Sequence, residues 1–519
     1  MLLAEVIVLL PIIHQCHYFS QRHHFNKLIY LSSLESSQRQ KLGSLLKYLA
    51  DTRWGRKNLK SAWSYEEFSK HLKPSVYSDW QNLIETQKKT ADSFICGKVK
   101  KYVATSGTTN ALKWIPYSRP FQKDLQMAAG AWLTDIGKLY PKTLKGKHYW
   151  SLSWIPNHQR NLGMTTDDSS LLSPLSKILH NLIFAVPGAS AYLPSCSDSL
   201  FASAVYLASS TDLSLMSFWS PSFGLELLNV LEKRKDEIAQ ILEQGKWTYS
   251  LPINKNLQVA SLLKNSKGPL CPEFFKQLWP RLALVSSWDS GSSQYWFAKL
   301  KALLPHASFQ GKGLWATEGV VTIPIGRQKV LAANSHFFEF RDLDTQQIIP
   351  AWKVEKGMKL QPLLSTSSGL LRYQLADQIE CTGRLRNLPC FNFLGRIGGV
   401  DMVGEKLDRE VIRKYLQDLR AQGFPVLSLI GVRGSKRPRY DLLVGPSANN
   451  TSSLEKETEA FLRNHHHYAL ARDLAQLDPV KIKLSQDPIN SYYKYFSDKP
   501  KGQVKIEDLV HSKYRGENV

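Results

Sequence analysis

The chain has 519 residues, too many for one ordinary hydrophobic core, so we expect two or more domains. Hydrophobic residues make up 43% of it and aromatic residues 11%, which excludes a disordered protein. The net charge of +23 favours anionic ligands, but no nucleic-acid-binding motif and no dense Lys/Arg stripe along a helix accompanies it, so nucleic acid is not an expected partner.

The six cysteines are scattered and include no C-x-x-C pair. Neither a zinc site nor a disulfide framework is therefore expected, and a reduced, cytoplasmic setting fits best.

The first apolar segment, Leu2 to Ile13, is interrupted only by Glu5. It is too short to span a bilayer and lacks the basic start of a signal peptide. A helix docked on the N-terminal domain and a loose extension both fit this segment, and stable membrane insertion is not expected.

Residues 35 to 95 predict mostly helices, and Lys98 to Ala104 predicts a strand. The strand leads into Thr105 to Lys113, in which Ser106, Gly107, Thr108 and Thr109 are followed four residues later by a lysine. Glycine allows close backbone approach to an anion, while the hydroxyls add donors and Lys113 adds positive charge. The segment predicts a phosphate-binding loop without the Walker A order, and a plain Ser/Thr/Gly turn is the alternative. A helix over Ser118 to Leu139 follows.

In the middle of the chain, Ser220 and Pro221 predict the start of a helix that ends at Gly245. Pro280 to Trp288 predicts a buried strand, which is followed by another helix. Short strands alternating with helices favour an α/β sheet architecture.

After residue 396 the pattern changes. An amphipathic helix over Leu407 to Leu419, strands over Val426 to Val432 and Tyr440 to Val444, and a second helix over Leu454 to Leu477 predict a small α+β unit. Histidines 465 to 467 cannot all face one metal on a helix, so we expect a solvated or half-packed face there. The domain prediction is 1–396 and 397–519, with a hinge near residues 394 to 404.

Further motifs follow the loop in a fixed order. They are Trp315-Ala316-Thr317-Glu318-Gly319, Arg372 to Asp377 (which we expect to end a strand on its acid), Leu394-Gly395-Arg396, Gly404-Glu405-Lys406-Leu407 and Gly502-Gln503-Val504-Lys505. The ordered set resembles adenylate-forming enzymes, and most closely the Gretchen Hagen type acyl acid–amido synthetases. The resemblance runs from about residue 40 to the C-terminus. It implies a large N-terminal α/β adenylation domain, a mobile α+β C-terminal domain, and the use of ATP and Mg²⁺.

The resemblance also implies a role for each motif. Ser106, Gly107, Thr108, Thr109 and Lys113 would hold the β- and γ-phosphates, and Thr317 the α-phosphate. Glu318 would hold Mg²⁺, Asp377 the ribose hydroxyls, and Trp315 would line the adenine pocket. Arg396 would assist at the ribose or phosphate, and Lys505 would bridge the attacking carboxylate and the phosphate. Three positions depart from the family pattern: Asn110, Ala376 and the Ile506-Glu507 pair after Lys505.

The resulting prediction is a cytoplasmic ligase that adenylates a carboxylic acid and passes the acyl group to an amine. The resemblance implies that this amine belongs to an amino acid. Small-molecule acids and amines would be its partners. An acyl-CoA ligase with the same first step and a non-catalytic basic binding protein remain open.

Overall fold

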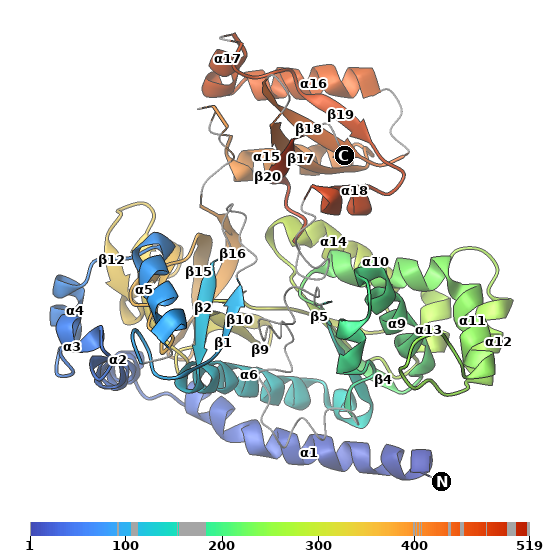
Figure 1. Cartoon of the computed structure of the whole chain (residues 1–519), viewed down its shortest axis with the longest axis horizontal. Helices are drawn as coiled ribbons and strands as arrows, with labels where there is room; N and C mark the ends of the chain where they lie inside the picture. Colours follow the sequence, from blue (N-terminus) through green and yellow to red (C-terminus); the bar gives the residue numbers. More distant parts are fainter. Residues whose placement is uncertain are drawn as a thin grey trace.

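The computed structural model describes residues 2–90, 93–104, 113–152, 154, 183–397, 400, 402–403, 405, 407–433, 437–446, 451–473, 475–495 and 505–515. Figure 1 shows a large N-terminal part built from several sheets and their helices, with the C-terminal sheet and its helices above it. The mixed α/β class, with a large N-terminal domain and a smaller C-terminal sheet domain, agrees with the prediction from the sequence.

The N-terminal segment forms a long helix, α1 (Leu2–Ile29), which runs along α6 (Arg119–Leu139) at the base of the molecule (Figure 1). Phe25 and Leu28 are buried, and Nε2 of His14 lies 2.9 Å from the carbonyl oxygen of Gly146. A helix docked on the N-terminal domain is therefore the correct alternative for this segment. Among the described helices, none combines the length and the apolar character that crossing a bilayer requires.

The helical stretch expected over residues 35 to 95 is confirmed. Its helices are α2 (Leu34–Ala50), α3 (Gly55–Asn58), α4 (Tyr65–His71) and α5 (Tyr77–Thr90). Helix α4 begins with a capping box, in which Ser64 and Glu67 satisfy each other's backbone N–H groups.

An antiparallel pair, β1 (Val99–Ala104) and β2 (Trp114–Ser118), flanks the loop. The helix expected over Ser118 to Leu139 is α6, and Ser118 caps it, since its hydroxyl accepts a hydrogen bond from the N–H of Phe121 at 3.4 Å.

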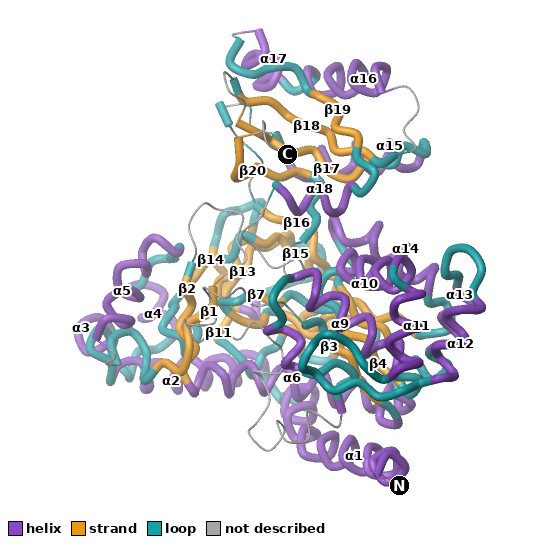
Figure 2. The backbone as a smooth tube through the Cα atoms, turned by 45° about the vertical axis from the view of Figure 1, so that its right-hand side comes forward, coloured by secondary structure: helices purple, strands orange, loops and turns teal. Residues whose placement is uncertain are grey.

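A four-stranded parallel sheet forms the second element of the N-terminal domain. Its strands are β3 (Lys147–Trp150), β4 (Leu213–Ser217), β5 (Leu284–Ser287) and β6 (Ser308–Gly311), adjacent in this order. Helices α9 (Cys196–Ser209), α10 (Pro221–Lys233), α11 (Lys235–Gln244), α12 (Leu257–Asn265), α13 (Pro272–Leu278) and α14 (Gln294–Leu303) accompany it. Figure 2 shows these helices gathered on one side of the sheet. Strand β5 confirms the buried strand expected before Trp288.

Short 3₁₀ helices occur at η1 (Pro141–Lys145), η3 (Gly188–Tyr192), η4 (Gly291–Ser293) and η5 (Ala351–Lys353).

The single helix expected from Pro221 to Gly245 is two helices, α10 and α11. The chain leaves helical geometry at Arg234, whose guanidinium lies 3.3 Å from the ring centroid of Phe201 and bonds Glu237. Ser220 occupies the N-cap position, but its hydroxyl lies 2.6 Å from that of Ser222 and caps no backbone N–H. Gly245 ends α11 in the left-handed conformation, as expected.

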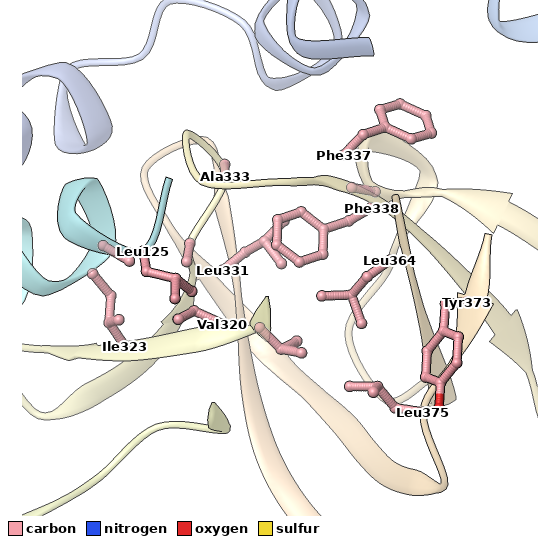
Figure 3. Packing of buried hydrophobic residues seen from close by; sticks show 14 of the residues in the cluster. Leu125, Val320, Ile323, Leu331, Ala333, Phe337, Phe338, Leu364, Tyr373 and Leu375 are labelled. Atoms are coloured by element: carbon pink, nitrogen blue, oxygen red, sulfur yellow. The ribbon is translucent and has the colours of Figure 1, made fainter. Parts of the chain in front are cut away.

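An eight-stranded, largely antiparallel sheet forms the third element. Its strands are β9 (Thr322–Ile325), β10 (Gln328–Leu331), β11 (Phe337–Asp342), β12 (Ile348–Pro350), β13 (Lys359–Ser365), β14 (Tyr373–Gln374), β15 (Asp377–Leu385) and β16 (Leu388–Arg396). Phe338, Leu331 and Leu364 pack together on its inner face (Figure 3).

Asp377 was expected at the end of a strand, and that expectation is wrong. Strand β14 ends at Gln374, and Asp377 opens β15. The two residues between them stay hydrogen-bonded to their neighbours. The N–H of Leu375 donates to the carbonyl of Pro362 at 3.0 Å, its carbonyl accepts from the Gln361 amide at 2.7 Å, and the carbonyl of Ala376 accepts from the N–H of Ile397 at 2.5 Å.

The C-terminal sheet has the order β19-β18-β17-β20. Its elements are α15 (Arg409–Ala421), β17 (Val426–Arg433), β18 (Pro438–Val444), α16 (Thr451–Arg463), α17 (His466–Asp473), β19 (Lys481–Leu484), α18 (Pro488–Lys494) and β20 (Leu509–Arg515). The expected helix, strands and helix are present, with two further strands at the sheet's edges. The second helix is divided into α16 and α17, because Asn464 and His465 make i→i−3 turns to Phe461 and Leu462. The ring of His465 is half-buried and His467 is exposed, as expected for that face.

Candidate active site

Thr317 and Glu318 form the tip of a tight hairpin. Strands β7 (Trp315–Ala316) and β8 (Gly319–Val320) pair antiparallel on either side of them. The carbonyl of Thr317 accepts a hydrogen bond from the hydroxyl of Tyr117 on β2 at 3.1 Å. The hairpin that carries both predicted residues is therefore itself fixed to β2, the strand that begins at Trp114.

A buried histidine supports the hairpin from beneath. Nε2 of His336 accepts a hydrogen bond from the N–H of Val320 at 3.1 Å. A side chain on Gly319 would place its Cβ 2.8 Å from the same nitrogen, so only glycine permits this close approach. His336 is completely buried, and this burial lowers its pKa well below 6.5. The imidazole is therefore neutral and serves as an acceptor.

Glu318 stands in a set of interacting charges. Removal from water raises the pKa of Glu318, and the nearby Asp377 raises it further, whereas Arg396 and Lys113 act in the opposite direction. The hydroxyl of Tyr373 donates to its carboxylate at 3.3 Å. A carboxylate surrounded in this way is a suitable ligand for a hard cation.

Asp377 and Arg396 face each other across the ends of two strands. They are register partners at the start of β15 and the end of β16, and Nε of Arg396 donates to Asp377 at 3.3 Å. Asp377 chiefly accounts for the raised pKa of the Arg396 guanidinium, and Glu507 and Glu318 contribute to it. The ion pair of Arg396 is thus formed with another predicted site residue.

Lys505 lies beside this pair, although it comes from the C-terminal domain. Its ammonium nitrogen is 4.6 Å from the ring centroid of Phe393 and 5.4 Å from that of Trp288. Burial lowers the pKa of Lys505, Glu507 and Asp377 oppose that shift, and Arg396 reinforces it. The structure therefore brings a lysine from the last described segment to the acid and the arginine at the end of the large sheet.

The Ile506-Glu507 pair after Lys505 departs from the family pattern, and the structure shows the surroundings of Glu507. Glu507 forms an ion pair with Arg409 at the start of α15. Burial alone would raise the pKa of Glu507, but Arg409, Arg396 and Lys505 together lower it. Glu507 therefore supplies negative charge between the two domains.

Trp315 and Lys113 have separate surroundings. The Trp315 ring lies 5.9 Å from that of Trp219 and 6.4 Å from that of Trp132. Trp315 thus belongs to an aromatic group at the carboxyl ends of the parallel strands. The ammonium of Lys113 is 5.7 Å from the ring of Tyr77, and its charge acts on Glu318.

Several predicted positions lie outside the described residues: Ser106, Gly107, Thr108 and Thr109 of the loop, Gly404, Lys406, and residues 502 to 504. Glu405 of the Gly-Glu-Lys-Leu motif is described and is a structural residue. It is buried, and its carboxylate accepts hydrogen bonds from the N–H groups of Met402 and Val403, each at 2.8 Å.

Four residues that lie at this site were not predicted from the sequence: Tyr373, His336, Phe393 and Trp288. Tyr373 stands inside a quoted motif, four positions before Asp377, so a signal for it was present. The other three are ordinary core residue types, and only the tertiary arrangement brings them to the site.

Comparisons with known proteins agree with this geometry. A sequence profile described as the GH3 family N-terminal domain matches residues 25–309, more than half of the chain, and one described as the GH3 family central domain matches residues 329–396. No curated protein matches the sequence.

Two solved structures are similar over nearly the whole chain. One is described as GH3.15 acyl acid amido synthetase, with a TM-score of 0.77, 16% identity, and coverage of 93% of this chain and 92% of that one. The other, AtGH3.15 acyl acid amido synthetase in complex with 2,4-DB, has a TM-score of 0.79, 16% identity, and coverage of 95% and 94%. At this identity the likeness establishes a shared fold.

Proposed function

The chain belongs to the GH3 family, and from this premise we propose that it is an ATP-dependent ligase that adenylates a carboxylic acid and transfers the acyl group to an amine. The product is an amide, and the amine belongs to an amino acid. Both similar structures are described as acyl acid amido synthetases, one of them with a small acid bound.

The observation that supports this function most directly is the position of Lys505 next to Arg396 and Asp377. A carboxylate and ATP are both anionic, so their reaction requires positive charge where they meet. Lys505 and Arg396 supply two such charges, while Asp377 provides oxygens that accept hydrogen bonds from ribose hydroxyls. Within the described residues, Asp377 and Arg396 act on the pKa of both Lys505 and Glu318.

The predicted roles extend to the neighbouring residues. Lys113, with Ser106, Gly107, Thr108 and Thr109 of the loop, binds the β- and γ-phosphates, and Thr317 binds the α-phosphate. Trp315 lines the adenine side. The division into residues 1–396 and 397–519 places all of these groups in the first domain and Lys505 in the second. A cytoplasmic location supplies ATP.

The residues present fit a magnesium ion that is held jointly by protein and substrate. Among the described residues, no group of three or more His, Cys, Asp or Glu side chains is arranged to hold a metal, so no all-protein cage is found there. Mg²⁺ is commonly bound through one or two carboxylates and substrate phosphates. Glu318 would be its protein ligand, and the ion would neutralise phosphate charge.

The reaction proceeds in two steps. A carboxylate oxygen of the acid attacks the α-phosphorus of ATP, a P–O bond forms, and the bond to the bridging oxygen breaks as pyrophosphate leaves. Lys505 lies where it can hold both anionic partners together. The amine nitrogen then attacks the acyl carbon, the C–O bond to AMP breaks, and the amine loses a proton.

The test is acid-dependent exchange of radiolabelled pyrophosphate into ATP over a panel of aryl, indole and fatty acids, followed by mass spectrometry of products with amino acids. We expect exchange, and an amide with at least one amino acid. Glu318→Ala and Asp377→Ala should abolish both. Exchange that yields a thioester with CoA, and no amide with any amine, would replace this function with that of an acyl-CoA ligase. ATP binding without exchange for any acid would contradict adenylation.

A further inference from the structure

A row of polar side chains crosses the parallel sheet at the carboxyl ends of its strands. Trp150, Ser217, Ser286 and Gln310 are register neighbours from β3 to β6. Each contributes a buried side-chain atom that makes no hydrogen bond to any residue that the structure describes: Nε1 of Trp150, the two serine hydroxyls, and Nε2 of Gln310. We call these four residues the polar row.

The polar row stands out from the residues around it. The preceding register row, Tyr149, Met216, Val285 and Phe309, faces the apolar core under α9 and α10. The polar row points to the opposite face, since successive residues of a strand alternate between faces. There it meets Trp132 of α6, whose indole N–H donates to Oε1 of Gln310 at 2.9 Å. Buried polar atoms are normally hydrogen-bonded, so four adjacent unbonded ones indicate a ligand that supplies the partners.

Aromatic side chains and one positive charge adjoin the row. Trp219 and Trp288 lie two residues beyond the row's serines, with ring centroids 5.7 Å apart. The ammonium of Lys312, two residues beyond Gln310, lies 4.0 Å from the Trp219 centroid and 5.4 Å from that of Trp132. Trp150, Trp219, Trp288 and Trp315 are each half-exposed, although Lys312 is buried. Flat, accessible indole surfaces of this kind suit an aromatic ligand.

The same contacts indicate how the ligand is oriented between Lys505 and the polar row. Trp288 touches Lys505 on one side and Trp219 on the other, and Trp219 touches Lys312. A path of aromatic contacts therefore leads from the group that meets the reacting carboxylate to the polar row. In open α/β sheets, ligands bind outside the carboxyl ends of the strands, which is where this path ends.

We infer that the polar row and Lys312 select an aryl carboxylic acid that carries a hydrogen-bond acceptor, a hydroxyl or carboxylate oxygen, at the end remote from its reacting carboxyl. The row offers this oxygen donors at several strands: the amide of Gln310, the indole N–H of Trp150 and the serine hydroxyls, which can also accept, while Lys312 favours negative charge. The inference rests on the proposed function, because the reacting carboxyl defines the other end of the acid.

The experiment compares matched acids on the full-length protein: phenylacetic acid with 4-hydroxyphenylacetic acid, and benzoic acid with 4-hydroxybenzoic acid. Pyrophosphate exchange gives kcat/KM for each. We expect kcat/KM to be about 10-fold or more higher for the hydroxylated acid of each pair. When the acid without the hydroxyl binds, the polar groups of the row have no hydrogen-bond partner. Ser286→Ala and Gln310→Leu should bring the ratio close to one. Ser210→Ala is the matched control, since this buried hydroxyl already donates to the carbonyl of Tyr206 at 2.9 Å, and its ratio should equal that of the wild type.

Calorimetric titration of the same acids separates this inference from the proposed function. Exchange without any preference for the hydroxylated acids, or a preference that both row variants retain, would overturn the inference and leave the ligase function intact. Preferential binding of the hydroxylated acids without exchange would support the inference and contradict the function. Neither exchange nor preferential binding would overturn both.

Discussion

Nε2 of His336 accepts a hydrogen bond from the N–H of Val320 at 3.1 Å, and this bond fixes the hairpin that carries Thr317 and Glu318. His336→Leu leaves that buried N–H without a partner, which costs about 1 to 3 kcal/mol of unfolding free energy. Because the hairpin also loses its support, we expect acid-dependent pyrophosphate exchange to fall by about 10- to 100-fold. Urea unfolding and exchange kinetics measure the two effects. Full activity in a destabilised His336→Leu protein would show that the histidine serves only the core.

The same histidine makes a prediction for pH. Its pKa is lowered well below 6.5 in the folded protein, so below pH 6.5 the unfolded chain binds the proton more readily. The free energy of unfolding should therefore fall as the pH drops below 6.5, by about 1.4 kcal/mol for each pH unit in which His336 accounts for one proton. Unfolding of the wild type and of His336→Leu between pH 5 and 8 gives the contribution by difference. Parallel pH profiles would contradict this account.

Asp135 on α6 makes stability depend on pH in the opposite direction from His336. Burial raises its pKa to about 6, although its carboxylate accepts a hydrogen bond from the N–H of Gly326 at 2.9 Å. The folded protein holds the proton more tightly than the unfolded chain does, so this contribution to stability is complete below pH 3.8 and disappears as the pH rises through 6. Asp135→Asn keeps an acceptor and avoids ionisation. We expect it to be more stable than the wild type at pH 8, by at most about 3 kcal/mol, and equally stable near pH 4. A destabilised Asp135→Asn protein at pH 8 would disprove the assignment.

Arg372 and Glu339 form a buried, bidentate ion pair, with both N–O distances at 2.8 Å. Removal of one partner leaves an uncompensated buried charge, so Arg372→Met and Glu339→Gln should each destabilise the protein by about 3 to 5 kcal/mol. The double variant should lose less than the sum of the two, since neither charge then remains. A double-mutant cycle by chemical unfolding measures the coupling, and strictly additive losses would show that the pair does not interact in this way.

Lys505→Ala should slow acid-dependent pyrophosphate exchange by about 100-fold or more, because it removes a positive charge from the meeting point of two anions. The matched control is Lys481→Ala, which alters an exposed lysine of the same domain. Its exchange rate should equal that of the wild type. Unimpaired exchange by Lys505→Ala would remove the lysine from the reacting centre.

The sequence predicted those elements that local signals specify. Ser118 followed by Pro120 marks the start of α6, and the amphipathic pattern marks α15. The errors fell where distant contacts override local patterns. At the break between α10 and α11, Arg234 contacts the ring of Phe201, and before β15 the carbonyl of Leu375 accepts a hydrogen bond from Gln361. Neither partner is adjacent in the chain, so periodicity does not reveal the interruption.

The predicted site was readable as an ordered series of motifs, and the structure brings Glu318, Asp377, Arg396 and Lys505 into mutual range. No sequence motif of this kind marked the polar row. Its members span residues 150 to 310, and serine and glutamine are ordinary residues at strand ends. Their alignment follows from the register of four parallel strands, which no local pattern specifies.

The polar row and the charged groups belong to different sheets. Asp377 and Arg396 stand on the antiparallel sheet, whereas Ser217, Ser286 and Gln310 each stand on a separate strand of the parallel one. If the row selects the acid as proposed, point substitutions along it would alter which acid is accepted without altering the charged groups on the antiparallel sheet. A lineage of such enzymes could then change its acid one strand at a time while its chemistry is inherited intact.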